Sequence, residues 1–227
     1  MIRPALTIMA SIMLFACGGG DSSSSDPVIN SMDDIGVRKI GIDLVNVANE
    51  SVDFFIKENG SSNTLFDDGN KVATNLNNDT NYHAISWTSA SAMRIDLGVK
   101  DTNTQTKFSQ VDDVVLNNSE KLWAIAWLDT DDNELQLSTT IEEPSPIEGK
   151  YRIRVFSQQD TRVQVISTAV STVEVKKGNF SAHMTLNNCN GELFFGANSV
   201  DICNLDQGKS YLLISDGEDL LLAEEEK

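Results

Sequence analysis

The sequence predicts an all-β protein built from two sandwich domains. Beyond the N-terminal region, apolar and polar residues alternate, as in Ile40, Ile42 and Leu44, and this period of two is typical of half-buried strands. Turn-forming pairs such as Asn59-Gly60 separate the alternating runs at short intervals. No stretch combines helical periodicity with capping residues.

The composition is that of a folded, acidic protein. Of the 227 residues, 40% are hydrophobic, 17 are basic and 34 are acidic, which gives a net charge of -17. Such a surface repels phosphate groups, so we expect no nucleic-acid partner. With two histidines in distant segments and three cysteines, few residues remain for metal sites or nucleophilic triads. We therefore expect no enzymatic activity, no cofactor and no metal.

The N-terminus contains a candidate lipoprotein signal. Residues 5–16 form an apolar run that is long enough for a signal-peptide core and too short to span a bilayer. The run ends in the tetrapeptide LFAC, which resembles the lipobox of bacterial lipoproteins: an aliphatic residue, a variable one, a small one, then cysteine. The resemblance implies a signal peptide over residues 1–16, cleavage before Cys17, and attachment of diacylglycerol and an N-acyl chain to Cys17.

A flexible tether is expected after that cysteine. The string GGGDSSSSD follows Cys17 directly, and we assign residues 17–36 to the lipidated cysteine and a tether. The alternative, an ordinary secretory signal with a chance cysteine, does not account for this string. In Gram-negative lipoproteins an aspartate after the cysteine tends to retain the protein in the inner membrane. Gly18 therefore implies the outer membrane, with the lipid anchor as the contact with the bilayer.

A proline-containing acidic segment, residues 141–149, divides the remaining chain. We place the first sandwich at residues 37–140 and the second, smaller one at residues 150–222. The last residues, 223–227, read as a solvated acidic tail.

Two repeated patterns connect the predicted domains. A shift of 111 residues places Ile42 and Leu44 on Ile153 and Val155. A leucine, a polar turn and an alternating strand also recur in LNNDTNYHAISW, LNNSEKLWAIAW and LDQGKSYLLIS. With IDLVNVA and SVDFFIKENG, the first two of these make the first domain similar to domain-of-unknown-function family 4397 of secreted and lipid-anchored bacterial proteins. The resemblance implies tandem immunoglobulin-like antiparallel β-sandwiches, and the second domain matches loosely.

Cys189 and Cys203 are predicted to form a disulfide. Each lies seven residues from Gly196, so a hairpin centred on Gly196 would bring the two cysteines opposite each other. The closed loop corresponds to a stabilisation of about 3 kcal/mol. Neither a CxxC motif nor a histidine cluster supports a metal or catalytic role.

Asp129, Asp131 and Asn133 have the spacing that begins a calcium loop. The match then fails, because Glu134 stands where an EF-hand loop needs glycine and Thr140 where it needs a bidentate glutamate. A polar hairpin turn is the favoured interpretation.

Trp123, Ile125 and Trp127 lie on one face of an alternating segment whose other face is also apolar. Such a strand is either covered on both faces or presents a Trp platform that could stack on sugars. Core packing is favoured, and Trp87 poses the same choice. His83 and His183 have no nucleophile or paired carboxylate at motif spacing.

The sequence thus favours a lipid-anchored envelope protein that acts as a non-enzymatic binding or scaffolding module for another envelope protein or an extracellular ligand. A carbohydrate-binding or hydrolytic accessory domain that uses Trp and acidic side chains is the alternative. A purely structural role is the third possibility.

Overall fold

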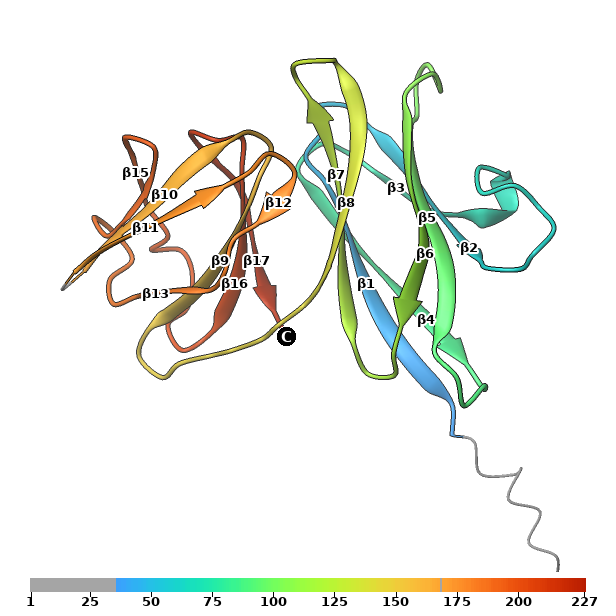
Figure 1. Ribbon diagram of the computed structural model, residues 1–227, viewed down its shortest axis with the longest axis horizontal. Coiled ribbons are helices and arrows are strands. Elements are labelled where there is room, and N and C mark those ends of the chain that lie inside the picture. Colours follow the sequence, from blue (N-terminus) through green and yellow to red (C-terminus); the bar gives the residue numbers. More distant parts are fainter. Residues whose placement is uncertain (1–35, 168) are drawn as a thin grey trace, which may run out of the picture. The chain divides into compact units, whose positions relative to one another are not determined.

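The computed structural model describes residues 36–167 and 169–227. Within them the chain is all-β, as predicted, with strands in four sheets and one short 3₁₀ turn, η1 (Asp68–Asn70) (Figure 1). Residues Ile35–Lys227 form one compact unit. The predicted signal peptide (residues 1–16), Cys17 and residues 18–35 of the predicted tether lie outside the described residues.

The first sandwich consists of two sheets with the strand orders β4-β1-β7-β8 and β3-β2-β5-β6. The alternating runs seen in the sequence form these strands. Their bounds are β1 (Arg38–Asn46), β2 (Val52–Glu58), β3 (Lys71–Asn75), β4 (Asp79–Trp87), β5 (Met93–Asp101), β6 (Phe108–Leu116), β7 (Lys121–Asp129) and β8 (Glu134–Ile141).

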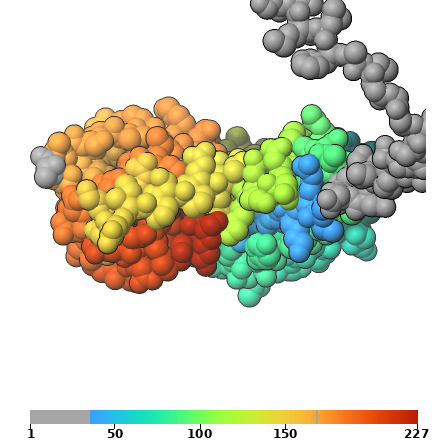
Figure 2. Space-filling view, turned by 90° about the horizontal axis from the view of Figure 1, so that it is seen from below, coloured from blue at the N-terminus to red at the C-terminus, as the bar shows by residue number. Residues whose placement is uncertain are grey.

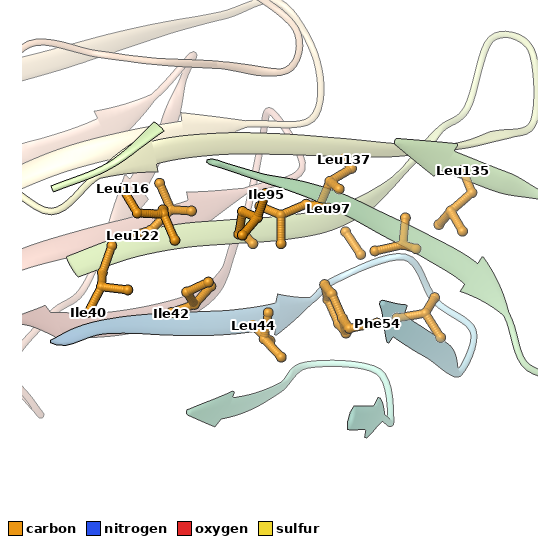
Figure 3. Packing of buried hydrophobic residues seen from close by; sticks show 14 of the residues in the cluster. Ile40, Ile42, Leu44, Phe54, Ile95, Leu97, Leu116, Leu122, Leu135 and Leu137 are labelled. Atoms are coloured by element: carbon orange, nitrogen blue, oxygen red, sulfur yellow. The ribbon is translucent and has the colours of Figure 1, made fainter. Parts of the chain in front are cut away.

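The core of this sandwich lies between its two sheets. Alternate residues of the strands point inward, so that Ile42 and Leu44 of β1 meet Phe54 of β2 and Leu97 of β5 (Figure 3). These side chains are at most 1% exposed. Full burial of each such side chain contributes about 1.5–3 kcal/mol, which makes this core the main support of the first sandwich.

The second sandwich has the strand orders β12-β9-β16-β17, with β13 also paired to β9, and β11-β10-β14-β15. Its core includes Val155, Val163, Phe195 and Leu213. The bounds are β9 (Tyr151–Ser157), β10 (Thr161–Ile166), β11 (Val170–Val175), β12 (Asn179–Phe180), β13 (Met184–Leu186), β14 (Leu193–Phe195), β15 (Asn198–Val200), β16 (Ser210–Ser215) and β17 (Leu220–Glu226).

The two sandwiches share one topology. Strands β1 and β9 hold equivalent places, as do β7 and β16, which agrees with the 111-residue shift and with two of the repeated phrases. The β1/β7 and β9/β16 pairs are parallel, whereas the sequence led us to expect antiparallel sheets. In the immunoglobulin constant order the first strand lies beside the second. Here the chain passes directly from β1 to β2 in the opposite sheet. It returns to the sheet of β1 only at β4 and again at β7.

The prediction of a solvated acidic tail over residues 223–227 is wrong. Residues 223–226 belong to β17, and Glu226 is 3% exposed. Successive residues of a strand face opposite sides, so Glu224 and Glu226 share the face that meets the first sandwich, where Glu224 accepts a hydrogen bond from Thr80 Oγ1 (2.8 Å). The buried Glu226 pairs with the guanidinium of Arg154 and accepts a hydrogen bond from Ser210 Oγ. Figure 2 shows this red C-terminal end beside the yellow segment that follows β8.

Candidate functional site

The strand with the two Trp residues is covered on both faces. Its inner face belongs to the first core, and its outer face packs on the sheet β12-β9-β16-β17 of the second sandwich. Trp123 is 1% exposed and Trp127 is 5% exposed. We call this contact the junction; its apolar members are Val45, Val47, Trp123, Ile125, Trp127, Phe156, Leu212 and Ile214, with Phe180, Leu221 and Leu222 at the margin.

This geometry confirms core packing for Trp123 and Trp127 and removes the sugar-stacking platform at this strand. Trp87 is also buried, in the first core. The indole N–H of Trp127 donates to Ser138 Oγ (3.0 Å), which in turn donates to the carbonyl of Gly178 (2.9 Å). Through Ser138, hydrogen bonds therefore link the Trp127 ring of the first sandwich to a turn of the second.

The ammonium group of Lys177, from the second sandwich, lies against the acidic turn that resembled a calcium loop. The Nζ atom lies 3.0 Å from Asp129 and 2.7 Å from Asp131. These bonds lower the pKa of Asp129 and raise the pKa of Lys177. Asn133 instead accepts a hydrogen bond from Lys107. In the part of the chain that the structure describes, no group of three or more acidic, His or Cys residues is placed to hold a metal.

Loops from both sandwiches meet at one end of the junction and form a shallow groove. The buried Gln158 amide donates to the Val47 carbonyl (2.8 Å), and the Gln159 amide donates to Thr130 Oγ1 (3.2 Å). The groove has a volume of about 390 Å³. We call it the end groove; it is lined by Asn49, Thr130, Gln158, Gln159, Asp216 and Glu218.

A second pocket lies beside Trp87, at the end of the first sandwich where β1 begins. Its volume is about 440 Å³, and Trp87, Met93, Glu58 and Arg94 are among its lining residues. The indole N–H of Trp87 donates to the carbonyl of Ser91 (2.9 Å), which holds the following loop against the pocket. Glu58 is the single carboxylate in the lining.

The two histidines belong to different sandwiches, His83 to the first and His183, between β12 and β13, to the second. His83 is on the edge strand β4, and its partial burial lowers its pKa. His183 Nε2 lies 3.2 Å from the buried Glu226, and its Nδ1 lies 3.8 Å from Glu143. That histidine is part of the polar margin of the junction, together with Arg154.

Cys189 and Cys203 are joined as a disulfide, with 4.7 Å between their α-carbons. The hairpin between them pairs Leu193 with Val200, so the strands end before either cysteine. The predicted centre at Gly196 is therefore off by half a residue. The bond from Ile202 N to the Cys189 carbonyl (2.9 Å) holds the extension that brings the cysteines together.

The sequence did not indicate Gln158, Lys177, Asp216 or Glu218 as site residues. All four stand in or beside turns whose sequences, such as Asp216-Gly217, mark loops. No sequence signal places these loops next to loops of the first sandwich, because the contact depends on how the two sandwiches dock.

Comparisons with known proteins add no family. No protein-family model matches the chain, and no curated protein matches it. The similarity to family 4397 therefore stays a prediction. Across residues 36–167 and 169–227, no helix is both long and apolar enough to cross a membrane.

Proposed function

We propose that this chain is a lipid-anchored protein of the bacterial envelope, held in the outer membrane through Cys17, and that it acts as a non-enzymatic binding or scaffolding module. The LFAC motif and the Gly/Ser-rich string after it support the anchor. The partner is another envelope protein or an extracellular ligand.

One structural observation carries the proposal of a binding role. The junction buries Trp123 and Trp127 and thereby sets the end loops of two sandwiches side by side. Loops on a rigid β-scaffold are a common place for recognition. The junction also makes the pair of sandwiches one binding body, since the end groove needs residues of both.

The anchor is tested by labelling cells with radioactive palmitate. The natural chain takes up label and fractionates with the outer membrane, whereas Cys17→Ser takes up none. Cys189→Ser, which leaves the LFAC motif intact, is the control and keeps the label. A natural chain that stays unlabelled and soluble would refute the anchor.

Exposure is tested by protease treatment of intact cells, with disrupted cells as the control. Digestion in intact cells directs the search to extracellular ligands. Protection until the outer membrane is broken directs it to periplasmic partners, which crosslinking would capture.

The pocket beside Trp87 supports a second candidate, carbohydrate binding. It combines the small part of the Trp87 side chain that is exposed (9%) and Met93 with the polar side chains of Glu58, Asn59 and Arg94. Glycoside hydrolysis ordinarily needs a pair of carboxyl groups, and this lining has one, so the pocket favours binding over hydrolysis. Loss of oligosaccharide binding in Glu58→Gln, with Glu120→Gln unaffected, would support this candidate.

A further inference from the structure

The end groove presents acceptor atoms that no protein donor satisfies. Within the described chain, no donor reaches Oε1 of Gln158, Oδ2 of Asp216 or the carboxylate oxygens of Glu218. Gln158 is 5% exposed, so its amide is fixed in place. These oxygens are open to solvent at the groove, where they can accept hydrogen bonds from a ligand that donates them.

Most donors of the groove are already engaged. The Gln158 amide N–H is bonded to Val47, and that of Gln159 to Thr130. Asn49 keeps an amide donor, since its Oδ1 is the atom bonded to Asn77. The groove therefore offers more free hydrogen-bond acceptors than donors, and its two carboxylates make it negatively charged.

The loops that supply these acceptors are rigidly built. Gly217 has a φ of +113°, and a β-carbon there would lie 3.2 Å from the Gln159 side chain. Asp216 Oδ1 accepts from the backbone N–H of Glu218 (2.9 Å) and of Asp219 (2.8 Å). The turn thus holds the Asp216 carboxylate at the groove before any ligand arrives, which lowers the entropy cost of binding.

We infer that the end groove is a docking site for an arginine side chain on an exposed loop of a partner protein. A guanidinium has five N–H donors and no acceptor, and it bonds to carboxylates in pairs. It matches the unsatisfied Gln158 oxygen and the two carboxylates, and the net charge of -17 attracts a basic partner. This inference rests on the proposed binding function and specifies the partner's chemistry.

Two other ligands fit the groove less well. A saccharide usually packs on an aromatic ring, and no aromatic residue lines the groove. A calcium ion prefers several carboxylates, and two line it.

The test is fluorescence anisotropy of the full chain, purified in detergent, with a labelled glycine peptide that contains two central arginines. The matched probe is the same peptide with citrulline, which keeps the shape of arginine without its charge. We expect the citrulline peptide to bind about tenfold more weakly. Glu218→Gln should weaken arginine-peptide binding about fivefold.

The control variant is Glu148→Gln, which makes the same charge change at the opposite end of β9 and should leave binding unchanged. Equal binding of the two peptides would overturn the inference. So would equal weakening by Glu148→Gln and Glu218→Gln, because the attraction would then be that of the whole acidic surface. Displacement of the peptide by a neutral oligosaccharide would assign the groove to sugars and likewise overturn it.

Failure of the anchor is distinguishable from failure of this site. Palmitate labelling reports on Cys17 alone, and the peptide assay in detergent does not depend on the anchor. A chain that binds the arginine peptide with the expected variant pattern supports the groove whatever the labelling result.

Discussion

The indole ring of Trp127 packs directly on the α-carbon of Gly178. A β-carbon at residue 178 would lie 2.7 Å from Cζ2 of the ring, and the glycine has a φ of +72°. Trp127 belongs to the first sandwich and Gly178 to a turn of the second, so this contact fixes how closely the two sandwiches approach.

Replacing Gly178 should therefore loosen the junction. We expect Gly178→Ala to lower the free energy of unfolding by about 2–4 kcal/mol, because it adds a steric clash to the cost of a positive φ. Urea unfolding followed by Trp fluorescence measures the change.

Gly196→Ala is the matched control for that variant. Gly196 also has a positive φ, +57°, but nothing lies within 4 Å of a β-carbon there. It should cost about 1 kcal/mol. Equal losses in the two variants would show that the Trp127 contact contributes nothing.

The strands could be predicted from the sequence because their signal is local. Ile40, Ile42 and Leu44 alternate with residues of the outer face, and the structure places all three in the first core. The Cys189–Cys203 pair was also predictable, because a hairpin of a few residues lies between them.

The junction could not be predicted in the same way. The outer face of Trp123 and Trp127 was visibly apolar, but its cover comes from Leu212 and Ile214, which are far along the chain. Local composition was misleading at Glu226, whose burial depends on Arg154 in another strand. For the same reason the end groove appears only once both sandwiches are docked.

The loop between β2 and β3 depends on another glycine. Leu65 and Phe66 fold over Gly98, where a β-carbon would lie 2.9 Å from Leu65 and 2.8 Å from Phe66. Gly98→Ala should push both side chains outward, with a cost of about 1–3 kcal/mol. Hydrogen exchange of residues 59–70 should become faster.

Gly69→Ala, in the same loop, is the control for this effect. Nothing lies within 4 Å of a β-carbon at Gly69, so the exchange of residues 59–70 should stay as in the natural chain. Unchanged exchange in Gly98→Ala would contradict the packing of Leu65 and Phe66 on Gly98.

The disulfide should stabilise the second sandwich in particular. Its 14-residue separation corresponds to about 3 kcal/mol from restriction of the unfolded chain. The double variant Cys189→Ser/Cys203→Ser should melt at a lower temperature in calorimetry, and a reductant should have no further effect on it. An equal melting temperature with and without the bond would contradict this estimate.

Glu142 lies at the polar margin of the junction, just after β8, and is 6% exposed. Its Oε2 accepts from the backbone N–H of Lys227 (3.0 Å), while its Oε1 is buried with no partner among the described residues. Burial and the neighbouring Asp43 raise the pKa of Glu142 to about 8, against the attraction of Lys121. A protonated Glu142 can donate to Asp43, which explains how two carboxyl groups share this site.

This raised pKa predicts that the natural chain loses stability as the pH rises. Between the ordinary pKa of 4.5 and about 8, the folded state holds a proton that the unfolded state releases. The stabilisation is thus fully present below pH 4.5 and is lost as the pH rises through 8. Glu142→Gln keeps a donor for Asp43 and cannot ionise, so its free energy of unfolding should depend less on pH in this window and should exceed that of the natural chain at pH 8. Urea unfolding at a series of pH values measures the free energy of unfolding. Glu148→Gln, at an exposed residue, is the control and should keep the pH dependence of the natural chain. If Glu142→Gln also keeps that pH dependence, the Glu142–Asp43 pair does not cause it.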